Sequence, residues 1–393
     1  MKIIHYCQHV LGIGHFFRSV EIARALHRHQ VVLVTGGPPV EVELPPHVNE
    51  YKLPGLKMDP NFTGLFPTDA KRTAPEVQDE RRLLLRSLFE KGAQDLFLVE
   101  LFPFGRKRFG FELLPLLESI RRGDFGSVRV ACSLRDILVE KEGQEAYERR
   151  VVDLLNRYFD ALLIHADPKL VSLEETFEST AEIRIPFAYT GFVTPVPGAN
   201  AGRELRKRLG MSEDEALVVA SVGGGKVGNV LLMAVLEAHS QLVEERRLRL
   251  HIFTGPYMSE GDFDTIARRA ASLPGVEVAR FTGEFLSFLA AADLSISMAG
   301  YNTSMNLLAA GVPSLVYPFG QNREQRLRAK KLAAVGSMTV VDNGDLEPSR
   351  LAELMKGSLK EPRTTVSSPV SLDGAQETAR WLEAWCGERG DLV

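Results

Sequence analysis

Cysteine is scarce in this sequence: the 393 residues include only Cys7, Cys132 and Cys386. An odd number of scattered cysteines without metal-like spacing argues against a disulfide framework and is typical of reduced thiols. Cys7 and Cys132 stand in apolar runs. This context predicts buried strand residues rather than a catalytic thiol.

The sequence also lacks a long hydrophobic run and an excess of positive charge. No apolar stretch approaches the ~20 residues of a membrane helix, and the apolar stretch at 3–7 is too short for a signal peptide, so we expect a cytoplasmic protein. The 47 Lys and Arg residues stand against 51 Asp and Glu residues, a formal net charge of −4. Nucleic acid is therefore not expected as the main partner, because phosphate binding requires concentrated Lys and Arg.

Two nucleotide-binding signatures are incomplete. The segment 12–17 has two glycines of a G-x-G-x-x-G fingerprint, but Phe17 replaces the third. The glycine-rich segment 221–228 lacks the G-x-x-x-x-G-K-[ST] spacing of a triphosphate-binding P-loop. Neither segment therefore identifies a dinucleotide-binding or P-loop protein.

Short apolar runs alternate with longer amphipathic segments, a pattern that predicts β-α units around parallel sheets. Since the chain is too long for one ordinary core, two domains are expected. The expected strands are 3–7, 31–35, 51–53, 96–100, 128–132, 161–165, 217–221, 250–254, 276–281, 294–297, 314–317 and 338–341. The expected helices are 18–27, 78–89, 144–158, 227–240, 263–272, 302–310, 323–335, 348–356 and 374–385.

A segment rich in Pro and Gly at 189–198 separates the two halves of this pattern, because it ends a strand and cannot sustain a helix. We expect an N-terminal domain over residues 1–195 and a C-terminal domain over residues 196–370. The final segment, 371–393, carries Trp381 and Trp385 on one helix face. This helix is expected to pack back on the N-terminal domain.

The loop at 8–18 follows a predicted strand and opens a helix, the place where parallel sheets bind ligands. Gly12 and Gly14 allow the backbone to turn tightly and to approach a ligand, and both are candidates for contacting the acceptor. His15 lies at the helix entrance, whose positive end favours a neutral imidazole. A neutral imidazole can deprotonate a hydroxyl, so His15 is a candidate general base. The alternative is a capping or core histidine.

Two loops of the second domain have features that suit an anion. Gly224, Gly225 and Lys226 lie in a strand–glycine–helix turn whose amides can hold one, although any tight turn can contain glycines. Within the segment 291–313, Gly300 permits a sharp turn into a helix whose free amides suit a diphosphate. Tyr301 follows Gly300, and Asn302, Thr303 or Ser304 can cap that helix.

The loop at 318–325 follows the next predicted strand and therefore lies at the same edge of the sheet. It carries Glu324 and Gln325, whose side chains can hydrogen-bond sugar hydroxyls. The alternative interpretation is a solvated helix start.

Three loops after predicted strands of the first domain are candidates for binding an acceptor: residues 100–109, 133–136 and 165–168. Phe104 and Arg106 belong to a basic, aromatic loop that suits an anionic acceptor or a membrane surface, and equally a solvated basic turn. Arg135 and Asp136 follow another strand and either bind the acceptor or pair with each other.

Residues 291–325 resemble the donor domain of GT-B glycosyltransferases, most of all the MurG-like group, family 28, and its predicted bacterial relatives. The pattern A-D-x-x-I-S-x-x-G-x-x-T-x-x-x-x-x-A-A-G-V-P is followed by a proline and a polar N-R-E-Q loop. The resemblance covers about residues 200–340 and, before them, mainly the loop with His15. It implies an α/β GT-B fold of two Rossmann-like β/α/β domains that face a central cleft.

The resemblance also implies three sets of donor contacts. The nucleobase would lie against Phe281, Thr282 and Phe285. The diphosphate would meet Gly225, Gly300, Asn302 and Thr303. The sugar would meet Glu324 and Gln325. Asn306 stands where the relatives generally have a glutamate that binds both ribose hydroxyls, so donor recognition is expected to differ.

The sequence therefore predicts a glycosyltransferase that moves a sugar from a UDP- or dTDP-sugar to an acceptor hydroxyl, with inversion and with His15 as the base. The acceptor is a small molecule, a glycan or a lipid-linked group, and peripheral membrane contact is possible. No metal or cofactor is expected, since a helix terminus and backbone amides can stabilise the leaving diphosphate. The alternatives are a nucleotide-sugar 2-epimerase or hydrolase on the same fold, and a non-catalytic nucleotide-sugar-binding subunit.

Overall fold

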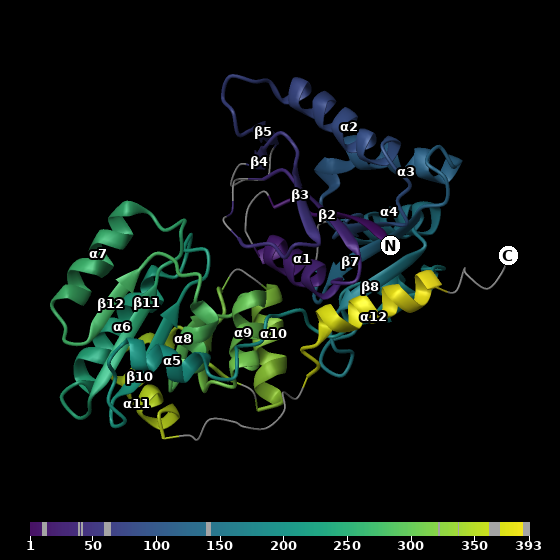
Figure 1. Ribbon diagram of the computed structural model, residues 1–393. Coiled ribbons are helices and arrows are strands. Elements are labelled where there is room, and N and C mark those ends of the chain that lie inside the picture. Colours follow the sequence, from purple (N-terminus) through teal and green to yellow (C-terminus); the bar gives the residue numbers. More distant parts are fainter. Residues whose placement is uncertain are drawn as a thin grey trace. The chain divides into compact units, whose positions relative to one another are not determined.

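The computed structural model of the chain describes residues 1–9, 14–37, 40, 42–58, 64–138, 143–320, 323–336, 338–360 and 370–387. The chain divides into two compact units (Figure 1). Unit 1 comprises Met1–Val193 and Asp373–Val393, and unit 2 comprises Thr194–Leu372.

Unit 1 contains a seven-stranded parallel sheet in the order β3-β2-β1-β6-β7-β8-β9. Every residue of β6 and β8 is buried, as expected of central parallel strands covered on both faces. The strands are β1 (Lys2–Tyr6), β2 (Gln30–Thr35), β3 (Val48–Lys52), β6 (Leu96–Glu100), β7 (Arg129–Arg135), β8 (Ala161–His165) and β9 (Phe187–Tyr189). A separate antiparallel pair consists of β4 (Leu56–Met58) and β5 (Leu65–Pro67).

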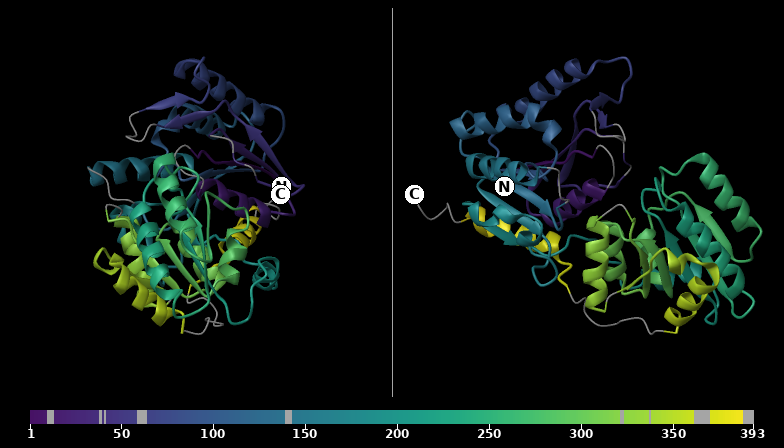
Figure 2. Two further views of the ribbon diagram at one scale, coloured as in Figure 1. Left: turned by 90° about the vertical axis from the view of Figure 1, so that its left-hand side faces the viewer. Right: turned by 180° about the vertical axis from the view of Figure 1, so that it is seen from behind.

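The helices of unit 1 are α1 (Gly14–Ala25), α2 (Ala74–Glu90), α3 (Gly110–Arg122), α4 (Gln144–Tyr158) and α12 (Gly374–Gly387). Although α12 comes last in the chain, it packs on α1 (Figure 2). Both helices contribute side chains to one core cluster on the sheet. Trp381 and Trp385 stack at a centroid distance of 5.1 Å, which confirms that they share a helix face. The Arg129 guanidinium lies 4.5 Å from the Trp385 ring centroid and attaches the end of α12 to β7.

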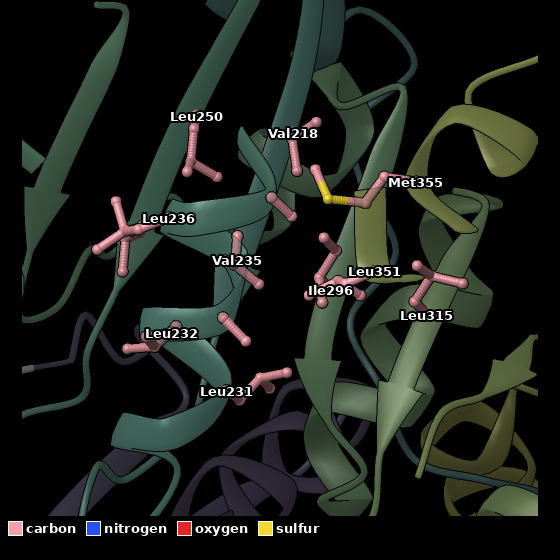
Figure 3. Close-up of a cluster of buried hydrophobic side chains, with 14 of the residues drawn as sticks. Val218, Leu231, Leu232, Val235, Leu236, Leu250, Ile296, Leu315, Leu351 and Met355 are labelled. Carbon is pink, nitrogen blue, oxygen red and sulfur yellow. The ribbon is translucent and has the colours of Figure 1, made fainter. Parts of the chain in front are cut away.

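Unit 2 contains a six-stranded parallel sheet in the order β12-β11-β10-β13-β14-β15. Its strands are β10 (Ala216–Ser221), β11 (Leu248–Phe253), β12 (Val276–Ala279), β13 (Leu294–Met298), β14 (Ser314–Tyr317) and β15 (Thr339–Val340). Its helices are α5 (Ala201–Arg208), α6 (Asn229–Leu242), α7 (Glu260–Ala271), α8 (Phe285–Ala291), α9 (Tyr301–Ala310), α10 (Arg323–Ala334) and α11 (Pro348–Ser358). Side chains of α6 and α11 pack with those of the central strands in one hydrophobic cluster (Figure 3).

The strand order reverses once in each sheet, and this reversal decides where a ligand can bind. In unit 1 the reversal lies between β1 and β6, and in unit 2 between β10 and β13. Open parallel sheets bind ligands outside the carboxyl ends of the strands at such a point. The segments that follow β1, β6, β10 and β13 are therefore the places to look for a site.

Most of the expected elements are confirmed. The segments 96–100, 161–165, 314–317 and 144–158 have the bounds predicted for them, and most of the others differ at their ends by a few residues. No helix among the described residues is long and apolar enough to cross a membrane.

A fully buried ion pair lies on the face of the unit 1 sheet opposite α1. Arg81 of α2 donates from Nε to Glu112 Oε2 at 2.9 Å and from Nη2 to Glu112 Oε1 at 2.6 Å. The Tyr6 hydroxyl donates to the same carboxylate, and Arg81 also donates to Gln8 Oε1 and to the Pro54 carbonyl, each at 2.9 Å. The network therefore joins α2 and α3 to the Gln8 side chain after β1 and to the Pro54 backbone after β3.

Arg81→Met is expected to lower the free energy of unfolding of unit 1 by about 3–5 kcal/mol, because it leaves the Glu112 carboxylate buried and unpaired. The chain's two tryptophans, Trp381 and Trp385, both lie in unit 1, so their fluorescence during urea unfolding reports on this unit alone. Arg82→Met is the matched control: Arg82 is exposed, and its pair with Asp79 should contribute only about 0–1 kcal/mol. Equal losses in the two variants would contradict the assignment.

Candidate functional site

In unit 1, the structure brings His15 to a buried carboxylate that the sequence analysis did not single out. His15 is the second residue of α1, the helix that follows β1. Glu100 is the last residue of β6, which pairs with β1 in the sheet. His15 Nδ1 lies 2.5 Å from Glu100 Oε1, with 21% of the His15 side chain and 1% of the Glu100 side chain exposed. Arg18, one turn further along α1, donates to the same Glu100 oxygen at 2.8 Å.

This geometry assigns the tautomer of His15. An ionised carboxylate only accepts hydrogen bonds, so His15 Nδ1 carries the hydrogen and Nε2 keeps its lone pair. Arg18 Nη2 also lies 2.9 Å from His15 Nδ1, but with that nitrogen protonated the guanidinium donates to the Glu100 carboxylate and not to the ring. Burial opposes ionisation of Glu100, but the charges of His15, Arg106 and Arg18 outweigh it and hold the pKa of Glu100 well below its usual range. Burial also lowers the pKa of His15 to about 3; Glu100 opposes this shift, and Arg106 and Arg18 add to it. At neutral pH the ring is therefore uncharged, and the lone pair of Nε2 can accept a proton.

The loop after Glu100 has an unusual backbone. Leu101 and Arg106 adopt left-handed conformations, with φ of 65° and 57°. Such conformations cost on the order of 1–3 kcal/mol each in a residue with a side chain, and they cluster at functional sites. The loop places Arg106 Nε 3.8 Å from Glu100 Oε2. Arg106, predicted as an acceptor residue, thus lies beside the His15–Glu100 pair.

The other predicted acceptor residues are Gly12, Gly14, Phe104, Arg135 and Asp136. Gly12 lies outside the described residues, and Gly14 begins α1. Phe104 is in the core, with its ring 5.2 Å from that of Phe177, so its side chain is unavailable to a ligand. Arg135 ends β7, and Asp136 directly after it is buried.

A buried polar cluster lies beside Glu100, on the face of the sheet that α1 and α12 cover. His165 of β8 contacts Ser133 Oγ at 2.7 Å and Thr190 Oγ1 at 2.8 Å. His5 of β1 is completely buried, and neither of its ring nitrogens has a hydrogen-bond partner within the part of the chain that the structure describes. Such an unsatisfied polar group costs about 1–3 kcal/mol. Burial lowers the pKa of His5 to about 4, so it stays neutral.

His5→Leu is expected to stabilise unit 1, and more strongly at pH 5 than at pH 7.5. The pKa of His5 is lowered in the folded state, so between about pH 6.5 and 4 the unfolded state binds a proton that the folded state does not. The free energy of unfolding therefore decreases as the pH is lowered from about 6.5 to 4. The slope is up to ~1.4 kcal/mol per pH unit, and leucine removes it. Urea unfolding at the two pH values measures the difference. The exposed His27→Leu should reproduce neither effect.

In unit 2, two loops rich in glycine pack against each other beside the strand reversal. Gly223, Gly225 and Gly228 have positive φ. A Cβ on Gly225 would lie 2.3 Å from the Thr254 carbonyl oxygen, and Tyr257 N donates to Gly224 O at 2.9 Å. The glycines are therefore needed for packing between these loops, whether or not an anion binds there. Lys226 is exposed, with its Nζ 5.9 Å from the Tyr257 ring centroid.

The residues predicted to contact a nucleobase follow β12. Phe281 is 54% exposed, an unusual state for a phenylalanine, and Thr282 caps the next turn by accepting from Glu284 N at 3.1 Å. Phe285 begins α8, and its ring lies 5.7 Å from that of Phe253 at the end of β11. An exposed aromatic face next to a supported one suits stacking on a flat base.

The residues predicted to contact the diphosphate lie at the start of α9. Gly300 is its N-cap, Tyr301 is buried, and Asn302 and Thr303 are partly exposed in its first turn. Helix amides at such a terminus point outward and favour an anion. Asn306, one turn on, accepts at Oδ1 from the Thr194 hydroxyl at 2.9 Å, a bond that ties α9 to the first residue of unit 2.

The residues predicted to contact the sugar have structural partners. Glu324 is buried and pairs with Arg328 at 2.7 Å, and the Arg328 guanidinium lies 5.3 Å from the Tyr301 ring centroid. Gln325 Oε1 accepts from Phe319 N at 3.1 Å in the loop after β14. These contacts fix the start of α10 relative to α9.

A D-x-D triplet, Asp262-Phe263-Asp264, lies in the first turns of α7. Ser259 is the N-cap of α7, and its Oγ accepts from the Asp262 amide at 3.1 Å. The Asp262 carboxylate in turn accepts from Ser259 and from Asn229. No group of three His, Cys, Asp or Glu residues in the described segments is arranged to hold a metal ion.

Comparison with known proteins finds a family match for most of unit 2. Residues 218–377 match the model of the glycosyltransferase family 28 C-terminal domain. The UDP-N-acetylglucosamine--N-acetylmuramyl-(pentapeptide) pyrophosphoryl-undecaprenol N-acetylglucosamine transferase of Methylobacterium radiotolerans is 29% identical over 171 residues, 42% of this chain and 44% of that protein. The protein of the same name from Caldanaerobacter subterraneus is 29% identical over 162 residues, 40% of this chain and 44% of that protein. The chain thus spans less than half the length of these relatives.

Solved structures resemble the chain over nearly its whole length. The calicheamicin glycosyltransferase CalG4 has a TM-score of 0.63 at 17% identity, covering 100% of this chain and 99% of that chain. MurG of Acinetobacter baumannii has a TM-score of 0.54 at 16% identity, covering 97% of this chain and 95% of that chain. The expected fold class, GT-B with two Rossmann-like units, is confirmed, as is the resemblance to family 28.

Proposed function

We propose that this chain, whose residues 218–377 match the glycosyltransferase family 28 C-terminal domain, is a glycosyltransferase that moves a sugar from a nucleotide-diphosphate sugar to an acceptor hydroxyl. Unit 2 would bind the donor, and unit 1 would bind the acceptor. The observation that carries the proposal is the pairing of His15 with the buried Glu100 at the strand reversal of unit 1.

The geometry supports a single displacement with His15 as the base. As the acceptor oxygen attacks the anomeric carbon, its proton passes to His15 Nε2, and Glu100 accepts from Nδ1–H and stabilises the imidazolium. The bond between the anomeric carbon and the diphosphate oxygen breaks, and the nucleoside diphosphate leaves with the electron pair. The amides at the start of α9 stabilise the negative charge that grows on it. One displacement inverts the anomeric centre.

We propose UDP- or dTDP-sugars as donors, with the exposed Phe281 and the supported Phe285 stacking on the pyrimidine. Asn306 can make only part of the ribose contact of a glutamate, since one of its two polar atoms is an amide nitrogen that donates. Gly300, Asn302 and Thr303 would receive the diphosphate without a metal ion.

A thermal-shift screen of nucleotides tests the donor half. UDP or dTDP is expected to raise the melting temperature by several degrees at 100 times its Kd, since saturation to that degree contributes about 2.7 kcal/mol. Phe281→Ala should reduce the shift. The matched control Phe66→Ala removes another exposed phenylalanine, in unit 1, and should preserve it.

The nucleotide-sugar is then incubated with and without candidate acceptors. Transfer that requires an acceptor supports the proposal, and donor turnover without one indicates an epimerase or hydrolase. No nucleotide shift with any base would overturn the donor site. Retention of the anomeric configuration in the product, observed by NMR, would overturn the single displacement.

A further inference from the structure

A cavity of about 180 Å³ opens in unit 1 beside the carboxyl ends of β2 and β3. The residues of its wall that matter here are Phe16, Thr35, Glu50, Lys52, Leu53 and Thr68. None of them belongs to the His15–Glu100 pair or to the donor loops. Phe16 directly follows His15 in α1, so the cavity lies at the same end of that helix as the proposed base.

The shape of the cavity is built into the fold. A Cβ on Gly37 would lie 1.9 Å from the His9 carbonyl oxygen, and one on Gly36 would lie 2.1 Å from Arg81 Nη1. A Cβ on Gly55 would lie 2.2 Å from Thr68 Oγ1. Three glycines thus line the cavity at positions where a Cβ would collide with His9, Arg81 or Thr68, and the buried ion pair of Arg81 supports the wall from behind. Such a wall is already formed before a ligand binds.

The polar chemistry of the cavity centres on Glu50. Its Oε1 accepts from the Thr35 hydroxyl at 2.7 Å, and its Oε2 lies 3.2 Å from Lys52 Nζ. Thr35 is buried, which fixes the carboxylate, whereas 22% of the Glu50 side chain is exposed and 63% of the Lys52 side chain. A carboxylate only accepts hydrogen bonds, so a ligand must bring donors. The Lys52 ammonium beside Glu50 balances its charge, so the pair as a whole favours an uncharged ligand over an anion or a cation.

The apolar side of the cavity and its size restrict the ligand further. Phe16 and Leu53 are buried to 1% and 3% exposure and give the wall a flat apolar surface. A cavity of about 150 Å³ is large enough for one six-membered ring. A ring with several hydroxyl donors and an apolar face is a pyranose.

We propose that this cavity binds an uncharged pyranose ring of the acceptor, with Glu50 accepting from its hydroxyls. The acceptor is then a saccharide, either free or attached to a lipid, rather than a phosphorylated head group. The identification of this ring as the acceptor rests on the proposed function; binding of the ring itself does not.

Saturation-transfer NMR on the full chain tests binding with four probes: the methyl glycosides of glucose, galactose, mannose and N-acetylglucosamine. At least one is expected to bind, and Glu50→Gln should weaken it about tenfold, the effect of losing a hydrogen bond to a charged group. Glutamine keeps the oxygen that accepts from Thr35, so the fold is preserved. Glu145→Gln, a fully exposed change in α4, is the matched control and should change nothing.

Binding of none of the four glycosides, or equal binding by wild type and Glu50→Gln, overturns the proposal. Tighter binding of glucose 6-phosphate than of glucose overturns the argument from charge. Co-sedimentation with phosphatidylcholine vesicles containing a glucosyl lipid separates the two sources: vesicle binding lost in Glu50→Gln supports a lipid-linked saccharide, and binding of methyl glycosides alone supports a free one.

Measuring both glycoside binding and the nucleotide-induced shift in melting temperature on the same samples tests this proposal separately from the proposed function. A UDP-induced rise in melting temperature without glycoside binding overturns the pyranose site and leaves the transferase standing. Glycoside binding without any nucleotide shift overturns the transferase and supports the pyranose site.

Discussion

Replacing His15 with alanine is expected to lower kcat for sugar transfer about 10²–10⁴-fold, the usual contribution of a positioned general base. Nε2 is the atom that takes the acceptor proton, because Nδ1 is occupied by the hydrogen bond to Glu100. The rate is measured as release of the nucleoside diphosphate with the donor and acceptor found in the binding screens. The KM for the donor should change little, since the proposed donor contacts lie in unit 2.

Two controls separate loss of the base from loss of structure. His27→Ala removes an exposed imidazole beyond the end of α1 and should keep the rate within about twofold of wild type. The UDP-induced shift in melting temperature should persist in His15→Ala. If His15→Ala retained full activity, another group would have to accept the proton.

The sequence predicted most strands of the two parallel sheets, because a buried parallel strand is a short apolar run that can be recognised in the sequence alone. It missed three helices for identifiable reasons. α5 has one buried residue among many charged ones, so no apolar stripe marks it. α8 is almost continuously apolar and therefore shows no helical period. α3 contains Pro115, which reads as a helix breaker in sequence.

The candidate site was predicted in part. His15 and the start of α9 could be found because each has a local signal, a polar or small residue between a strand and a helix. Glu100 could not, since it lies 85 residues from His15 and its importance depends on β1 and β6 being neighbours. The one available signal was an acidic residue at the end of an otherwise apolar strand.

Some residues predicted to contact the ligand have structural contacts instead. Glu324 and Gln325 have the residue types that bind sugars, but the structure gives each a partner within unit 2. Gly225 likewise has a packing role against Thr254. Residue type and spacing therefore predict which loops lie at the site. The contacts decide which side chains remain available to a ligand.

Glu100→Gln is expected to lower kcat about 10²–10³-fold across the whole pH range, because the imidazolium loses its counter-charge and the imidazole its orientation. The pH profile distinguishes this role from a structural one. The Glu100 carboxylate raises the pKa of His15, so its removal lowers that pKa. The acid limb of kcat/KM can therefore move only to still lower pH.

Arg106→Gln provides the comparison with the opposite sign. Arg106 lowers the pKa of His15, so its removal should raise that pKa and move the acid limb upward from about pH 3. Wild type should keep a flat profile between pH 5 and 8, since His15 remains neutral throughout. Two variants that change the same carboxylate environment thus shift the limb in opposite directions if His15 is the base. A common shift would show instead that both act through the stability of the loop after β6.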